Sequence, residues 1–259
     1  MLAYSISHLT LLGGVGLLLA LVAAGAAKGL IGVGMPIVAM PLVSHFIDLP
    51  AAVALLSVPL ILSNLRQAVE GGGTTAAVWR LTPILAGFCA GIVVGVSLLL
   101  TLDGAWLKPL VGAALLFAVT AVVMKPERTL TPTGERIAGP IAGLLGGLFG
   151  GVAALPGPIV FVYLLATPQG KDSFVKLASV YLVCSSAALA LVLSRFDHLT
   201  LADACVSLAS VIPVLVGMAL GAQIRPHVPA KLFRLLILGV VVVSAIDLLF
   251  TGVIHAMWF

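Results

Sequence analysis

The sequence predicts an all-α polytopic membrane protein with two inverted-topology repeats and eight to ten transmembrane helices, some of them short and broken by glycine and proline. Of 259 residues, 61% are hydrophobic and 8% are charged, whereas a soluble domain carries about 25% charged residues. The mean hydropathy is +1.27. Strands of a membrane barrel alternate apolar and polar residues, but the apolar runs here are continuous, as in Leu11–Ala27 and Val240–Phe250. Helices are therefore the expected spanning elements.

Ten apolar segments follow one another along the chain. They cover approximately 9–28, 35–47, 50–66, 77–101, 105–124, 137–154, 157–168, 174–194, 201–222 and 233–252. The most polar connection, 125–136, lies near the middle and is interpreted as a cytoplasmic linker. It separates a first transmembrane repeat, 1–124, from a second, 137–259.

The two halves carry the same signals in the same order. A Pro-x3-Gly-x3-Gly motif opens a long apolar segment at Pro83 and again at Pro213. Each half also begins with a long apolar run that ends in a cluster of glycine and proline, at 29–36 and at 146–158. A segment too short to span comfortably follows each cluster. The pattern predicts five segments per half, the second of them short.

The basic residues test that arrangement. If all ten segments reverse the side of the chain, one face carries eleven of the thirteen basic residues and the other carries only Lys108 and Arg195. If each glycine and proline cluster merely interrupts one span, the basic residues divide evenly. The positive-inside rule favours the first arrangement. It predicts both termini outside the cytoplasm, and five segments per half make the second half inverted.

Other functional classes lack their signals. The basic residues form no patch with interleaved aromatics, so nucleic-acid binding is not expected. Cys89, Cys184 and Cys205 lie inside apolar runs without metal-ligand spacing, and neither a metal nor a cofactor is expected. No Walker A sequence indicates use of ATP, and no motif of an intramembrane enzyme is present. The N-terminus lacks the features of a cleaved signal peptide, so the first apolar run is expected to remain as a helix.

The two breaks are the expected binding site. Glycine and proline free backbone groups that hydrocarbon cannot satisfy, so such breaks must line a cavity or pack on protein. A helix that starts in the middle of the membrane points unpaired N–H groups and a positive dipole end at that cavity. Short segments starting after Met35 and Pro156 would do this from opposite directions. The pattern predicts a midplane site for a small anionic substrate.

The breaks also resemble a known family. The sequence Gly29-Leu-Ile-Gly-Val-Gly-Met-Pro-Ile-Val-Ala-Met-Pro41 resembles the first-half signature of the TauE/SafE family, the sulfite and organosulfonate exporters. Gly147-Leu-Phe-Gly-Gly-Val-Ala-Ala-Leu-Pro-Gly-Pro158, followed by Tyr163, resembles its second-half signature. Asp48-Leu-Pro-Ala-Ala and Asn64-x2-Gln67 also fit, while Met35-Pro36 stands where the family usually shows further glycines. The resemblance implies transport, chiefly export, of sulfite, sulfonates or related organic anions across the bacterial inner membrane.

The candidate substrate-binding residues come from the breaks and the segments beside them. They are Lys28, Gly29, Gly32, Gly34, Pro36, Ser57, Asn64, Gln67, Gly150, Gly151, Pro156, Gly157, Pro158, Tyr163, Tyr181 and Ser185.

Each has a competing structural interpretation. The glycines could serve close helix packing, and Lys28 could extend its ammonium to the cytoplasmic surface. Asn64, with Arg66 and Gln67, forms either a buried polar cluster or a solvated helix end. Serines in membrane helices often bond their own backbone, which applies to Ser57, Ser185 and Ser186 alike.

Asp247 lies within the last apolar run, where a carboxylate is a candidate proton carrier or an interfacial residue. Asp48 and the histidines are interpreted as solvated. A secondary transporter working by alternating access is therefore expected, with an anion channel or a subunit of a larger complex as alternatives. The lipid bilayer is its expected surrounding, and the sequence leaves the oligomeric state open.

Overall fold

The computed structural model describes residues 2–31, 35–70, 75–123, 130–168, 171–224, 226–227, 239, 241–243 and 245–250. Within these ranges all regular structure is helical, which confirms the predicted all-α class. The helices are α1 (Leu2–Ser7), α2 (Leu11–Ile31), α3 (Met35–Val43), α4 (Leu49–Glu70), α5 (Thr75–Thr101), α6 (Gly104–Val123), α7 (Pro132–Ala153), α8 (Gly157–Ala166), α9 (Lys171–Arg195), α10 (Leu201–Ala209) and α11 (Val211–Ile224), with further helical residues at 239, 241–243 and 245–250.

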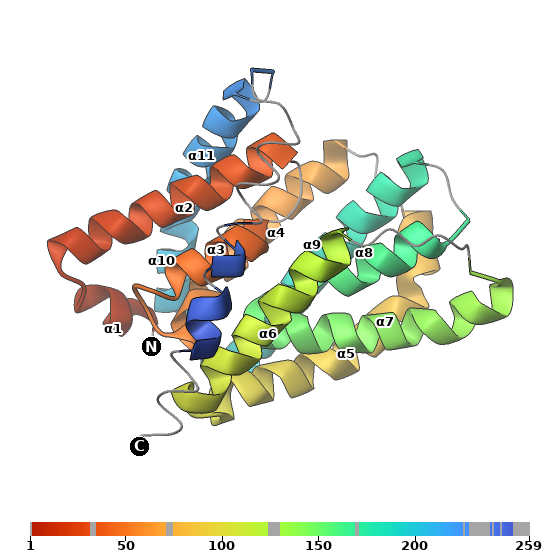
Figure 1. The fold of residues 1–259 in the computed structure, drawn as a ribbon, viewed down its shortest axis with the longest axis horizontal. Coiled ribbons are helices and arrows are strands. Elements are labelled where there is room, and N and C mark those ends of the chain that lie inside the picture. Colours follow the sequence, from red (N-terminus) through yellow and green to blue (C-terminus); the bar gives the residue numbers. More distant parts are fainter. Residues whose placement is uncertain are drawn as a thin grey trace.

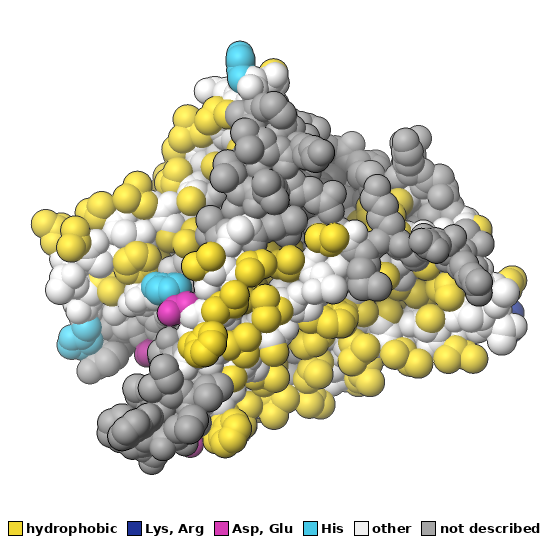
Figure 2. Space-filling view, in the orientation of Figure 1, with side chains coloured by type: hydrophobic (Ala, Val, Ile, Leu, Met, Phe, Trp, Pro, Cys, Tyr) yellow, Lys and Arg dark blue, Asp and Glu magenta, His cyan; other side chains and the backbone are white. Residues whose placement is uncertain are grey.

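The predicted segments correspond to these helices in order. Six stretches of helix are long and apolar enough to cross a membrane, among them Leu11–Leu30 in α2 and Leu49–Arg66 in α4. The outward faces are apolar, and Figure 2 shows hydrophobic side chains over most of the visible surface that is described. Leu11 is 89% exposed and Leu201 is 84% exposed. Such faces are suited to lipid, and the chain is a multi-pass membrane protein.

Two details differ from the segments predicted. The short helix α1 precedes the first of them, and the ninth is divided into α10 and α11 at Ser210. The division has a local cause, because Pro213 has no N–H to donate to the carbonyl four residues earlier. The predicted linker lies mostly outside the described residues, and its last residues belong to α7. Thr131 caps that helix by accepting from the Gly134 N–H, and Pro132 occupies the first turn.

The second half begins with a helical hairpin. Helix α7 ends at Ala154, whose φ of 54° and ψ of 30° are left-handed, and α8 then runs back along α7. The Leu130 N–H, just before α7, donates to the Ala166 carbonyl at the end of α8 over 2.7 Å. Ten residues of helix span about 15 Å, half the hydrocarbon core of about 30 Å. Helices α7 and α8 therefore form a hairpin that returns the chain to the start of α7.

The first half begins in a corresponding way. Helix α3 follows α2 after residues 32–34, which lie outside the described residues. The ring of Phe46, beyond the end of α3, fills the space beside Gly16 near the start of α2. The end of α3 thus returns to the start of α2, as the end of α8 returns to the start of α7. Both hairpins agree with the assumption behind the charge count, that each short segment reverses the chain.

Glycines join helices from opposite halves. Gly87 and Gly91 of α5 face the backbone of α7, and an added Cβ at either position would collide with a carbonyl oxygen of that helix. Gly217 and Gly221 of α11 face the backbone of α2 in the same manner. Small residues permit such close approach of membrane helices. These four glycines belong to the repeated Pro-x3-Gly-x3-Gly motif, so the motif serves helix packing.

This pairing is reciprocal. The first long helix of one half packs on the fourth segment of the other, as α2 with α11 and α7 with α5. Figure 1 shows the first pair at one side of the molecule and the second pair at the other. Such an exchange is expected if the halves are related by a two-fold axis. The inverted orientation of the halves stays a prediction.

A proline in α4 leaves one carbonyl without its usual donor, and a neighbouring helix supplies the hydrogen bond. Pro59 lacks the N–H that would bond the Leu55 carbonyl, and Ser207 of α10 donates to that carbonyl over 2.7 Å instead. The Val58 N–H in turn donates to the Ser207 hydroxyl over 3.1 Å. Ser210 adds a third bond, to the Leu55 carbonyl over 3.3 Å. In hydrocarbon such groups need protein partners, and these bonds fix α10 against α4.

Candidate functional site

A buried polar cluster lies where α2, α4 and α9 meet. Lys28, near the end of α2, is 4% exposed. Its ammonium donates to the Ser63 hydroxyl over 2.9 Å and to Asn64 Oδ1 over 2.5 Å. Asn64 Nδ2 donates to the Ser186 hydroxyl of α9 over 2.9 Å. We call these four residues the Lys28 cluster, and they join the two halves of the chain.

Lys28 has no anionic partner in the cluster. Among the residues that the structure describes, no carboxylate pairs with Lys28, and its two bonds go to neutral oxygens. An ammonium has three donors, so one N–H remains for another acceptor. Burying an unpaired charge costs several kcal/mol, and ionisable residues inside membranes are rare and functional. The cluster is therefore suited to receive an anion.

The same positions recur in both halves. Residues 57–64 read Ser-Val-Pro-Leu-Ile-Leu-Ser-Asn, and residues 179–186 read Ser-Val-Tyr-Leu-Val-Cys-Ser-Ser. The spacing of 122 residues also relates Met35-Pro36 to Gly157-Pro158. Asn64 and Ser186 are equivalent by this spacing, and they bond to each other. Two equivalent residues in contact are expected where a two-fold axis passes between the halves.

This internal repeat is the signal that would have identified the cluster. Sequence reasoning proposed Lys28 and Asn64 and considered Ser186, but it missed Ser63. The same spacing places Gly150 opposite Lys28. The cation is thus supplied by the first half alone, and the second half offers no side chain at that position.

The break between α7 and α8 is buried and held by a tyrosine. Pro156, Gly157 and Pro158 are all buried. Tyr181 of α9 is fully buried, and its hydroxyl donates to the Pro156 carbonyl over 2.9 Å. The ring of Phe88 meets that of Tyr181 edge-on, with centroids 5.7 Å apart. The polar end of Tyr181 therefore fixes the backbone of the break.

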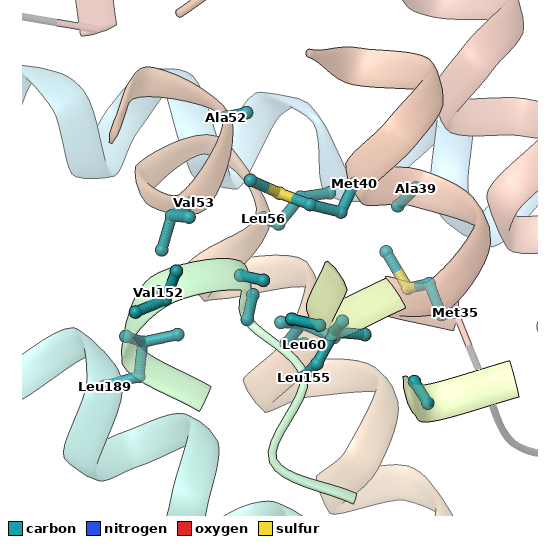
Figure 3. Packing of buried hydrophobic residues seen from close by; sticks show 14 of the residues in the cluster. Met35, Ala39, Met40, Ala52, Val53, Leu56, Leu60, Val152, Leu155 and Leu189 are labelled. Carbon is teal, nitrogen blue, oxygen red and sulfur yellow. The ribbon is translucent and has the colours of Figure 1, made fainter. Parts of the chain in front are cut away.

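Apolar side chains fill the space between the two breaks. Figure 3 shows Met35 at the start of α3 beside Leu60 of α4 and Leu155 of the second break. All three are at most 2% exposed. Asn64 follows Leu60 by one helical turn, so the Lys28 cluster lies next to this apolar layer.

The remaining candidates lie in different surroundings. Ser57 bonds the Val53 carbonyl and Ser185 bonds the Leu182 carbonyl, each in its own helix. The Tyr163 hydroxyl donates to the Glu135 carbonyl near the start of α7, over 3.4 Å.

The candidate glycines and the prolines beside them also lie in different surroundings. Gly29 faces the α11 backbone and Gly151 faces the α5 backbone, while Gly150 has Phe88 and Pro156 beside it. Pro36 lies in the first turn of α3 and is partly buried. Gly32 and Gly34 lie outside the described residues, as does the side chain of Gln67. The substrate contacts of all these residues stay predictions.

An open cavity lies away from the cluster. It has a volume of about 770 Å³ and is lined by the end of α1, the connection from α3 to α4 and the start of α6. Its ionisable lining residues are His8, His45, Asp48 and Lys108. In the described part of the chain, no three His, Cys, Asp or Glu side chains come together as metal ligands do.

The comparisons with known proteins give one match. A family model described as sulfite exporter TauE/SafE matches residues 17–248, nearly the whole chain. Neither the curated protein sequences nor the solved structures gave a significant match.

Proposed function

Because the chain belongs to the sulfite exporter TauE/SafE family, we propose that it is a secondary transporter that exports a small anion, either sulfite or an organosulfonate. The family consists of membrane transporters rather than enzymes. The expected location is the bacterial inner membrane, with both termini outside the cytoplasm.

The observation that carries the proposal is the buried, unpaired ammonium of Lys28. A helix that serves packing alone has no need of a buried lysine whose neighbours are a neutral hydroxyl and a neutral amide. A sulfite or sulfonate oxygen could take the third N–H of the ammonium and also accept from a nearby hydroxyl. Hydrogen bonds between charged groups are about twice as strong as neutral ones. The anion would supply the counter-charge that Lys28 lacks.

The two breaks add a favourable field. Helices α3 and α8 begin at Met35 and Gly157 in the interior. Each helix start carries about half a positive elementary charge, and backbone N–H groups there bind anionic groups. The buried apolar side chains of Met35, Leu60 and Leu155 lie in one layer beside the breaks (Figure 3). We infer that this layer parts during transport and gives the anion access to both.

The helix pairing indicates the moving bodies. In the pairs α2 with α11 and α5 with α7, glycines of one helix lie directly against the backbone of the other. Each pair is therefore expected to move as one unit. Helices α4 and α9 meet between the pairs at Asn64 and Ser186. Tilting one pair relative to the other about this contact would expose the Lys28 cluster to one face of the membrane and then to the other. This is alternating access about a site between the halves.

Counterflow in proteoliposomes tests the proposal. Purified protein is reconstituted, and labelled sulfite, sulfoacetate, taurine and a simple carboxylate are offered against each unlabelled compound. We expect saturable exchange of sulfite or a sulfonate, since a carrier exchanges through a single site. Flux that does not saturate would indicate a channel instead. If well-folded protein moves none of these compounds, the proposed substrate class is wrong.

A further inference from the structure

A histidine and an aspartate meet at the edge of the open cavity. His45 follows the end of α3, and Asp247 lies in the last described helical stretch, 245–250. His45 Nε2 and Asp247 Oδ2 are 3.2 Å apart, and the two side chains are 46% and 55% exposed. Figure 2 shows a histidine beside an acidic side chain, with hydrophobic side chains nearby. His45 lines the cavity, and Asp247 lies next to Leu248, which also lines it.

The hydrogen bonds of His45 require an extra proton. Its Nδ1 lies 2.6 Å from the Pro41 carbonyl oxygen. That oxygen only accepts, so Nδ1 carries a hydrogen. In a neutral imidazole Nε2 would then be an acceptor, yet it faces a carboxylate oxygen, which also accepts when ionised. The contact needs either an imidazolium with a carboxylate or a neutral ring with a carboxylic acid. In both cases the pair holds one proton more than a neutral imidazole and a carboxylate.

The pair connects a break helix to the rest of the protein. Helix α3 begins at the first break, near the Lys28 cluster, and ends two residues before His45. The stretch that carries Asp247 packs on α6, because Ala245 and Leu249 fill the space beside Gly112. With the proton present, the hydrogen bond between His45 and Asp247 holds the end of α3 against this stretch. When the proton leaves to water, Nε2 and the carboxylate oxygen are both acceptors, and the hydrogen bond is lost.

We propose that His45 and Asp247 form the proton-binding site through which movement of the anion is coupled to movement of a proton. This inference rests on the proposed function, since coupling requires a transported anion. The proton enters from water in the cavity, on the face predicted to be extracytoplasmic, and leaves to water on the cytoplasmic face when the pair opens, so that one proton crosses the membrane in each transport cycle. The other ionisable groups that line the cavity are His8 beyond α1, Asp48 before α4 and Lys108 of α6. None of these three lies in the His45–Asp247 contact that the structure shows.

The first test measures the proton directly, without transport. Protein with ¹⁵N-labelled histidine and ¹³C-labelled aspartate is prepared in lipid nanodiscs, and the His45 signals are identified by their loss in His45→Gln. We expect wild-type signals that show the extra proton, either on both ring nitrogens or as a carboxylic acid signal that is lost in Asp247→Asn. His8→Gln, in the same cavity, should leave the His45 signals unchanged. A His45 ring with a bare Nε2 beside an ionised Asp247 at the pH of transport would overturn the proposal.

The second test measures coupling. Proteoliposomes that contain a pH-sensitive dye report proton movement while labelled sulfite flows. We expect proton movement in step with sulfite, and a pH gradient should drive sulfite flux in wild type. In Asp247→Asn that driven flux should fall by about tenfold or more, within the usual range of coupling between sites, while His8→Gln retains it. Thermal unfolding of each variant controls for misfolding.

The outcomes separate the two proposals. Sulfite flux with no proton movement in wild type would overturn the coupling and leave the transporter function standing. Absence of flux for every anion would overturn the proposed function and the coupling together. The proton site itself would still be decided by the histidine signals.

Discussion

Replacing Lys28 by methionine separates the role of the charge from the role of the side chain in packing. Methionine is of similar length and is flexible, so it can occupy the same space between α2 and α4 without an ammonium. The expected result is a large loss of anion transport without a loss of stability.

The size of the loss follows from the geometry. A singly charged anion about 4 Å from Nζ would gain about 4 kcal/mol at an effective dielectric constant of about 20. If the anion displaces both present bonds of the ammonium, to Ser63 and Asn64, about 1 kcal/mol is lost for each. The net value lies between about 2 and about 4 kcal/mol. Lys28→Met should therefore raise the KM for sulfite between about 30-fold and about 1,000-fold.

Stability should respond in the opposite way. Removing a buried unpaired ammonium relieves a desolvation cost of several kcal/mol, while Asn64 Oδ1 loses a donor at a cost of about 1–3 kcal/mol. The variant should unfold at or above the temperature of wild type. The assays are sulfite counterflow in proteoliposomes and thermal unfolding in detergent, with Lys28→Arg as the variant that keeps the charge. A KM within about twofold of wild type in Lys28→Met would refute the assignment of the ammonium to the substrate.

Three further predictions concern stability, measured by thermal or denaturant unfolding. Asn64→Leu should destabilise by about 1–3 kcal/mol, because it removes buried hydrogen bonds to Lys28 and Ser186, and adding Lys28→Met should restore part of that loss. Gly25→Ala should destabilise by about 1–3 kcal/mol, because its Cβ would collide with the α11 backbone; Gly14→Ala in the same helix meets nothing and should gain about 0.5–1 kcal/mol. Ser207→Ala should cost about 1–3 kcal/mol, because it removes two bonds to the α4 backbone.

Each of these has a result that would contradict it. If Lys28→Met and Asn64→Leu add independently, the two side chains do not depend on each other. Equal effects of alanine at Gly25 and Gly14 would mean that α2 and α11 do not pack as described. An unchanged unfolding temperature in Ser207→Ala would mean that water or another group satisfies the Leu55 carbonyl.

Most of the architecture could be predicted from the sequence because hydrocarbon imposes a simple rule. Every segment that lies in lipid must be helical and apolar, and the ten apolar segments correspond to helices. The breaks can also be predicted from the sequence, since glycine and proline are the residues that most often interrupt a membrane helix. The division at Ser210 escaped prediction because Pro213 lies three residues beyond it, inside an unbroken apolar run.

Site residues are harder to identify from a sequence than helices, for a physical reason. A glycine that lines a cavity and a glycine that packs against a backbone have the same composition and the same neighbours in sequence. Gly29 and Gly151 were assigned to substrate, yet both face the backbone of a helix from the opposite half. Which face of a helix touches which neighbour depends on contacts between distant segments, and one sequence does not show them.

For the polar cluster, too, the sequence shows the region but not which side chains are buried. Asn64, Arg66 and Gln67 are close in sequence and were proposed together. In the structure Asn64 is 3% exposed, whereas Arg66 is exposed, because residues two apart lie on opposite sides of a helix. Polarity inside an apolar run marked the region correctly. Helical geometry then decided which side chain joined Lys28.

The pairing of α2 with α11 has a consequence for how the protein is made. Helix α2 leaves the ribosome before α11, and about 180 residues separate its end from the start of α11. At about 5–20 residues per second, synthesis of that stretch takes about 9–36 s. During this interval the glycine-lined face of α2 lies in the bilayer without its partner. The insertion machinery, or a chaperone in the membrane, must protect that face until the second half of the chain arrives. A nascent chain stopped before α11 should therefore be a substrate for membrane quality control, whatever the state of its other helices.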